Sequence, residues 1–210
     1  MLKAYKYRLY PNKQQIEQIQ KTFGCCRFVY NQCLNFKINK YKNENVSVSK
    51  IDLNNYCNRE LKKEYEWLKE VDKWSLTNSI YNLDYAYQRF FKEHTGYPKF
   101  KSKRDNKKSY KTNFSNNNIE ISFKNNKIKL PKLKWVKAKI HREFDGQIKS
   151  ATISQVSSEK YFVSVLVDTE HIPMCSTGCM VGIDLGIKDL LITSNGKKFD
   201  NIRIVKKYED

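Results

Sequence analysis

The sequence of 210 residues predicts an α+β protein in which a helical insertion interrupts a β-sheet. Apolar residues alternate with polar ones at the start, recur at steps of three and four through most of residues 12–90, and alternate again after residue 118. This order of strand, helices and strands implies that the first strand joins the later sheet. The helices are then an insertion within that sheet.

The first part of the chain predicts a strand and a long helix. Residues 2–10 alternate, which is typical of a half-buried strand. Asn12 with Gln15 three residues later is the sequence of a capping box, so we expect a helix to begin there and to reach about Tyr41. Its apolar residues keep helical spacing: Ile16, Ile19, Phe23, Cys26, Tyr30, Cys33 and Leu34.

Two further helices are expected before the sequence changes character. The second begins near Ser49 and runs towards Trp67 and Leu68, and the third opens at Asp72. The third has the clearest periodicity in the chain, carried by Leu76, Ile80, Leu83, Tyr87 and Phe90.

Residues 119–130 and 151–167 predict two β-hairpins, the first around an Asn125-Asn126 turn and the second across residues 157–160. A third apolar strand follows at residues 180–186, paired to residues 190–193, and it carries a carboxylate, Asp184, that looks buried. The second half of the chain is therefore expected to be β-rich.

The charge of the chain indicates a polyanionic partner. There are 40 Lys and Arg residues against 22 Asp and Glu residues, so the formal net charge is +18. Cations crowd into a basic loop, residues 96–117, together with aromatic side chains that could stack on unpaired bases. A solvated lysine-rich linker, or a lysine-rich codon bias, is the alternative reading of the same composition. The predicted loop contacts are Lys99, Lys101, Lys103 and Arg104.

Asp184 is the strongest candidate for chemistry, since a carboxylate inside an apolar strand is costly unless it is paired or binds a cation. Gly182 and Gly186 on either side would allow a phosphate or a metal-bound water to approach the backbone. Two other readings remain open: the first strand of a nucleotide-binding ATPase, and a carboxylate bonded to a turn.

The cysteines and the apolar runs point to an ordinary soluble chain. Cys175 and Cys179 could be half of a zinc site with His171, but loop thiols are the favoured reading. No run is long enough to span a membrane and the N-terminus has no signal peptide, so we expect a cytoplasmic protein with reduced thiols.

Taken in order, six segments of the chain resemble the N-terminal half of the transposon-encoded TnpB (OrfB) proteins, which are RNA-guided DNA endonucleases of insertion sequences. The resemblance covers nearly the whole chain. The segments are Tyr7 to Asn12, Arg27 to Asn31, Trp67 to Lys73, Gly96 to Lys103, Ile128 to Pro131 and Gly182 to Lys188.

This resemblance implies a split β-barrel wedge domain with a helical, helix-turn-helix-like recognition insertion, followed by an incomplete RNase H-like (RuvC) α/β domain. The implied boundaries place the first wedge strand at residues 1–11, the recognition domain at 12–117 and the wedge hairpins at 118–172. A linker at 173–180 then leads to the start of the nuclease domain at 181–210.

The resemblance also implies partners and site residues. A guide RNA and a DNA duplex with a target-adjacent motif would be bound, and Asp184 would be the first of three carboxylates that hold Mg²⁺ or Mn²⁺. The other two carboxylates and the family's zinc ribbon lie downstream in the family, so we expect no cleavage by this chain alone. A truncated or frameshifted remnant and a retained nuclease-dead regulator are the two competing explanations, and a lysine-rich structural or interaction protein is an alternative of another class. The residues implied for the DNA, besides Lys99, Lys101, Lys103 and Arg104, are Lys73, Thr77, Tyr110, Lys111, Thr112, Asn113 and Asn116.

Overall fold

A computed structural model describes residues 1–105, 108–170, 178 and 180–202. The chain divides into two compact units, Met1–Glu170 and His171–Asp210. Most of the expected linker at 173–180 lies outside the described residues. Within the part of the chain that is described, no helix is long and apolar enough to cross a membrane.

The first unit is built on a seven-stranded antiparallel sheet with the strand order β2-β6-β7-β1-β5-β4-β3. The first strand, β1 (Leu2–Tyr10), lies inside this sheet, where Tyr7 pairs with Val163 of β7 and Leu9 with Ala138 of β5. The expectation that the first strand joins the later sheet is therefore confirmed. The other strands are β2 (Lys108–Asn113), β3 (Glu120–Ser122), β4 (Lys127–Leu130), β5 (Lys134–Lys139), β6 (Gln147–Gln155) and β7 (Tyr161–Asp168).

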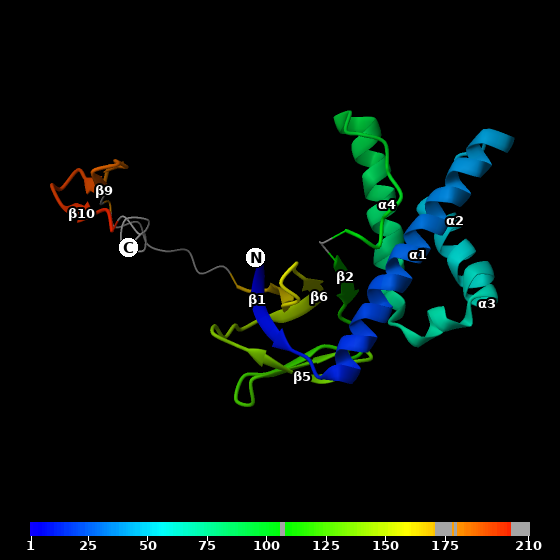
Figure 1. The fold of residues 1–210 in the computed structure, drawn as a ribbon, viewed down its shortest axis with the longest axis horizontal. Coiled ribbons are helices and arrows are strands. Elements are labelled where there is room, and N and C mark those ends of the chain that lie inside the picture. The colour runs from blue at the N-terminus through cyan, green and yellow to red at the C-terminus, as the bar shows by residue number, and fades with distance from the viewer. Residues whose placement is uncertain (106–107, 171–177, 179, 203–210) are drawn as a thin grey trace. The chain divides into compact units, whose positions relative to one another are not determined.

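The helices are inserted between β1 and β2, as Figure 1 shows by the blue to green ribbons beside the sheet. Asn12 and Gln15 form the predicted capping box of α1, and Ser49 and Asp72 cap the helices that begin at Lys50 and Lys73. α1 ends three residues later than expected, at Glu44. The segments are α1 (Lys13–Glu44), α2 (Lys50–Tyr56), a π-helix η1 (Cys57–Leu61), α3 (Lys62–Glu64), a 3-10 helix η2 (Glu66–Glu70) and α4 (Lys73–Glu93).

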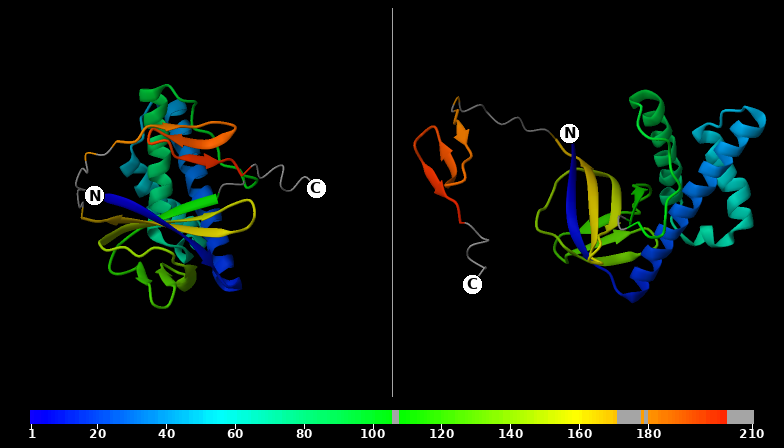
Figure 2. Two further views of the ribbon diagram at one scale, coloured as in Figure 1. Left: turned by 90° about the vertical axis from the view of Figure 1, so that its left-hand side faces the viewer. Right: turned by 45° about the horizontal axis from the view of Figure 1, so that its top comes forward.

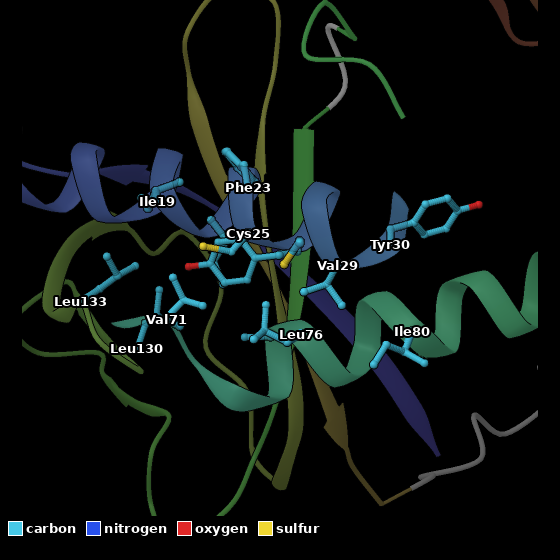
Figure 3. Packing of buried hydrophobic residues seen from close by; sticks show 14 of the residues in the cluster. Ile19, Phe23, Cys25, Val29, Tyr30, Val71, Leu76, Ile80, Leu130 and Leu133 are labelled. Carbon is cyan, nitrogen blue, oxygen red and sulfur yellow. The ribbon is translucent and has the colours of Figure 1, made fainter. Parts of the chain in front are cut away.

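The core of the first unit lies where α1 and α4 meet the curved sheet (Figure 2). In Figure 3, side chains of α1 such as Ile19 and Val29 point towards Leu76 of α4 and towards Leu130 at the end of β4. Burial of such apolar side chains stabilises a fold by roughly 25 cal/mol per Å² removed from water. One hydrophobic cluster thus joins the helical insertion to the sheet.

Two strands differ from expectation. Part of the basic loop, Lys108–Asn113, forms β2 and pairs with β6, because its Tyr110 and Thr112 are buried while the residues between them remain polar. β5 was missed because its buried side chains, Val136 and Ala138, are small and alternate with lysines. In both cases the partner strand, rather than local hydrophobicity, explains why the segment is a strand.

The second unit contains a small antiparallel sheet with the order β10-β9-β8. The predicted pairing of the Asp184 strand with residues 190–193 is confirmed, since Asp184 faces Ile192. The expectation of a buried strand is wrong, because Asp184 and its neighbours are exposed. The strands are β8 (Ile183–Asp184), β9 (Asp189–Thr193) and β10 (Lys198–Asp200).

Candidate nucleic-acid interface

Asn31 of α1 fixes the basic segment that follows α4. Its Nδ2 donates to the carbonyl oxygen of Lys101 over 3.0 Å, and its Oδ1 accepts from the Lys101 backbone amide over 2.8 Å. The Lys101 amine then lies over the ring of Tyr30, with Nζ 4.1 Å from the ring centroid. Desolvation of this amine lowers the pKa of Lys101. One predicted loop contact is therefore held in place by α1.

A small cavity of about 160 Å³ opens beside Lys101. We use the term loop cluster for the cations that line this cavity together with three exposed cations of the same segment: Arg27, Lys101, Lys108, Lys99, Lys103 and Arg104. Arg27 of α1 and Lys108 of β2 line the cavity with Lys101, against one carboxylate, Asp105. Asp105 accepts from the Ser102 amide over 3.1 Å. The cavity thus has three cationic side chains and one carboxylate, which already accepts a hydrogen bond. Such a lining suits the binding of a phosphate oxygen better than the binding of a cation.

Lys103 and Arg104 line an adjoining pocket of about 300 Å³ together with Lys108, so the two pockets share a wall. The Arg104 backbone amide donates to Ser102 Oγ over 3.1 Å, which orders the turn that carries both side chains. Lys99 is exposed on the same segment. The structure therefore brings together Lys101, Lys103 and Arg104.

The N-terminus of α4 is tied to β2 through buried polar groups. Asp72 accepts from the Ser75 amide over 3.0 Å and from Thr112 Oγ1 over 2.8 Å. Asn78 donates from Nδ2 to the Lys111 carbonyl over 3.1 Å and to Asn113 Oδ1 over 3.2 Å. These bonds fix the helix start against the strand.

A cleft of about 430 Å³ lies at this junction, and we call five of its lining residues the α4 cluster: Lys69, Lys73, Trp74, Asn116 and Lys132. Asp72, Ser115 and Asn118 also line it. The predicted residues Lys73 and Asn116 thus line one cleft, and Lys73 Nζ lies 5.6 Å from the centroid of the Trp74 ring. Trp74 Nε1 is buried and has no hydrogen-bond partner among the described residues. Thr77 is half-buried, one turn further along α4.

Other predicted contacts are placed differently. Tyr110 is 7% exposed and packs edge-on against Phe23, with the ring centroids 5.6 Å apart, and burial strongly raises the pKa of its hydroxyl. Thr112 is fully buried, and Asn113 already accepts from Asn78. Lys111 is exposed. Tyr110 and Thr112 therefore hold the framework on which the exposed cations stand.

Asp184 lies outside any group of metal-binding side chains in the described ranges. Within them no three His, Cys, Asp or Glu side chains are arranged to hold a metal ion. Gly182 and Gly186 lie close to protein atoms: a Cβ on them would meet Ser194 Cβ at 3.4 Å and the Asp189 carbonyl oxygen at 3.0 Å. The described residues thus do not compose the expected Mg²⁺ or Mn²⁺ site. Cys175, Cys179 and His171 lie outside the described residues.

Several members of the two clusters were absent from the residues predicted for the interface. Arg27 lies on α1, whose periodic apolar residues predict only that the helix packs against a core. Lys69 and Lys132 lie on two short segments that are far apart in the sequence. Only tertiary structure brings them to the clefts. A weak signal existed for Arg27, because it opens one of the six segments that carry the family resemblance.

Comparison with known proteins gives relatives along the whole chain. A family model described as a helix-turn-helix domain, HTH_OrfB_IS605, matches residues 1–45. InsQ of Escherichia coli (strain K12), named as a candidate RNA-guided DNA endonuclease, is 29% identical over 209 residues, which are 98% of this chain and 50% of InsQ. A protein of Streptomyces pristinaespiralis with a similar name is 29% identical over 207 residues, 95% of this chain and 50% of that protein.

Two further matches differ in extent. The virulence protein VsdF of Salmonella dublin is 34% identical over 113 residues, which are 49% of this chain and 95% of VsdF. One chain of the solved CRISPR-Cas12f ternary complex aligns with 92% of this chain and 50% of its own length, at 11% identity and a TM-score of 0.44.

The match to the helix-turn-helix model falls on β1 and a helix that is continuous from Lys13 to Glu44. A helix-turn-helix needs two helices joined by a short turn. The match to this family model therefore indicates common ancestry, and the matched residues do not form a helix-turn-helix. The chain spans about half the length of the InsQ and Streptomyces relatives. From these matches, the chain belongs to the TnpB (OrfB) family of insertion-sequence proteins.

Proposed function

We propose that this chain binds nucleic acid as a TnpB-type protein does, contacting a guide RNA and a DNA duplex that carries a target-adjacent motif. The seven-stranded sheet serves as the wedge domain, and the helices inserted between β1 and β2 serve as the recognition domain. The small sheet of residues 181–202 corresponds to the opening of an RNase H-like domain. The names of the relatives that match over nearly the whole chain support this assignment.

One observation carries the proposal: cations gather at both ends of β2. The loop cluster includes Lys108 at its first residue, and the α4 cluster lies beyond its last residue, Asn113. A strand of this length spans roughly 17 Å, which is about five base-pair steps of duplex DNA. Arg27, Lys73 and Lys132 have no ion pair within the described ranges, so they can face phosphates.

Within this proposal the two clusters have different roles. The loop cluster consists of cations on a segment fixed to α1, around a small cavity, which suits phosphate contacts. The α4 cluster, with Lys73 and Thr77 on a helix start and Asn116 opposite, offers donors and acceptors that can reach base edges. Asp184 serves as one metal ligand of the family's nuclease centre, which requires further carboxylates, and no cleavage step is assigned to this chain.

The test is binding of the purified chain to a fluorescent duplex across a range of salt concentrations. Replacing Lys99, Lys101, Lys103 and Arg104 by alanine is expected to weaken binding and to reduce the slope of log K against log [salt] by up to about 3.6, four contacts at about 0.9 each. A control of equal charge change replaces Lys3, Lys63, Lys124 and Lys127, which are exposed outside both clusters.

Lys73→Ala and Thr77→Ala, tested by selection on randomised duplexes, are expected to change the preferred motif rather than to weaken all sequences alike. Affinity that is flat with salt would contradict the phosphate contacts. Equal losses in the loop variant and its charge-matched control would contradict the placement of the interface.

A further inference from the structure

An apolar cavity of about 330 Å³ lies between the C-terminal halves of α1 and α4, away from both basic clusters. We call it the aromatic cavity, because Tyr41, Tyr87, Phe90, Phe91 and Tyr97 line it. The two helices pack tightly near their middles, where Ser79 Oγ donates to the Cys26 carbonyl over 2.7 Å, and they diverge towards these ends (Figure 1). The aromatic cavity lies in the space that opens between the two helices.

The rings of the aromatic cavity are held by one another. The hydroxyls of Tyr87 and Tyr97 are 2.8 Å apart in a hydrogen bond, and Tyr97 meets the ring of Phe90 edge-on at 5.3 Å between centroids. Phe90 in turn meets Phe91 at 5.0 Å. Phe91 is nevertheless 68% exposed and Tyr41 63% exposed, so flat apolar faces are open to solvent on a rigid base.

The polar residues around the cavity are cationic. Lys37 and Lys42 line it, together with Ser47, and among the described residues no carboxylate does. Lys37 Nζ lies 4.8 Å from the centroid of the Tyr87 ring and donates to the Val48 carbonyl. Desolvation lowers the pKa of Lys37, as expected for an amine held against an aromatic wall. The site therefore suits a ligand that has a flat apolar face and a negative charge.

We propose that the aromatic cavity receives an unpaired nucleobase of a single-stranded nucleic acid, stacked on Phe91 with its phosphate towards Lys42. A purine nucleotide combines a flat π-face with an anionic phosphate, and a volume of about 330 Å³ is within the range of small-ligand pockets. An acidic peptide would satisfy the charge but not the exposed ring faces. This inference rests on the proposed nucleic-acid binding and adds a separate contact, specific for unpaired strands.

The experiment compares Phe91→Ala with Tyr85→Ala. Tyr85 is on the same helix and is 59% exposed, but it does not line the cavity, so the pair is matched in exposure and in helix. Both are measured against a 12-nucleotide oligoadenylate and against a 12-base-pair duplex. We expect Phe91→Ala to lose on the order of 10-fold in affinity for the single strand and to bind the duplex unchanged. Tyr85→Ala should bind both as the parent chain does.

A second variant, Phe91→Trp, keeps a stacking surface and reports on it. We expect it to retain single-strand affinity and to lose indole fluorescence when the oligoadenylate is added, beyond any change in the parent chain. Equal behaviour of Phe91→Ala and Tyr85→Ala would overturn the base site while leaving duplex binding intact. If Phe91→Ala instead changes the oligomeric state in sedimentation, the cavity is a contact between copies. A parent chain that binds neither probe would refute the proposed function itself.

Discussion

β7 and β9 have similar apolar sequences but very different surroundings. In β7 the side chains of Val163, Val165 and Val167 are fully buried in the core of the first unit. In β9 Leu190 is 51% exposed, and in the adjoining turn Leu185 is 75% exposed. An apolar pattern therefore specifies a strand, but burial requires a second layer that only the first unit supplies.

The largest expected effect is a contrast between two leucines. Leu83 of α4 is fully buried, so Leu83→Ala should lower the free energy of unfolding of the first unit by about 2–5 kcal/mol through lost burial and a cavity. Leu185→Ala should change it by less than about 0.5 kcal/mol. Urea denaturation followed by fluorescence measures both. Similar losses would show that the second unit is packed in solution.

Alkaline pH provides a smaller test of the same contrast. Burial raises the pKa of the Cys26 and Cys33 thiols of α1 from 9.0 to about 12. Because the thiols are harder to ionise in the folded chain than in the unfolded chain, the folded state keeps its full stability below pH 9, the thiol pKa of the unfolded chain. That stability is lost as the pH rises from about 9 towards 12. Raising the pH from 8 to 10.5 should therefore lower the free energy of unfolding by about 1–2 kcal/mol for each thiol.

The measurement is the urea midpoint at several pH values for the parent chain and for Cys26→Ala. The variant is less stable at pH 8 because it loses packing, so the slope with pH is compared rather than the absolute stability. An unchanged slope would mean that the thiol is more accessible to water than the helix interface indicates.

The smallest expected effect concerns the partly exposed ion pair between β3 and β4. Lys129 Nζ lies 2.6 Å from Glu120 Oε1, and the two side chains are 39% and 41% exposed. Solvent screens such a pair, so a double-mutant cycle with Lys129→Ala and Glu120→Ala should give a coupling energy below about 1 kcal/mol. A coupling energy of several kcal/mol would instead mean that this edge of the sheet is shielded from water.

Local chemistry explains why much of the fold could be predicted. Asn12, Ser49 and Asp72 cap their helices as their side chains predict, because capping depends only on the next three residues. The two hairpins follow from alternation and from short turns. In contrast, β2 depends on hydrogen bonds to a strand about forty residues away, as in the pairing of Tyr110 with Ile153.

The interface was predictable in its charge but less so in its members. Lysine clustering in the sequence predicted Lys101 as a contact, whereas Arg27 reaches the same cavity only because Asn31 brings the segment to α1. Tyr110 was expected to be free for bases, and the tertiary core has enclosed it. Composition indicates the partner, but packing decides which side chains can touch it.

The place of β1 inside the sheet bears on how the chain is made. Leu2 pairs with Asp168, and Tyr7 with Val163, so β1 meets its partner more than 150 residues later in the sequence. At a synthesis rate of about 5–20 residues per second, the first strand waits roughly 8–30 seconds for β7 to be made. During that time the backbone groups of β1 and its side chains Tyr7 and Leu9, which the finished sheet buries, are exposed. The helices can therefore fold before the sheet closes.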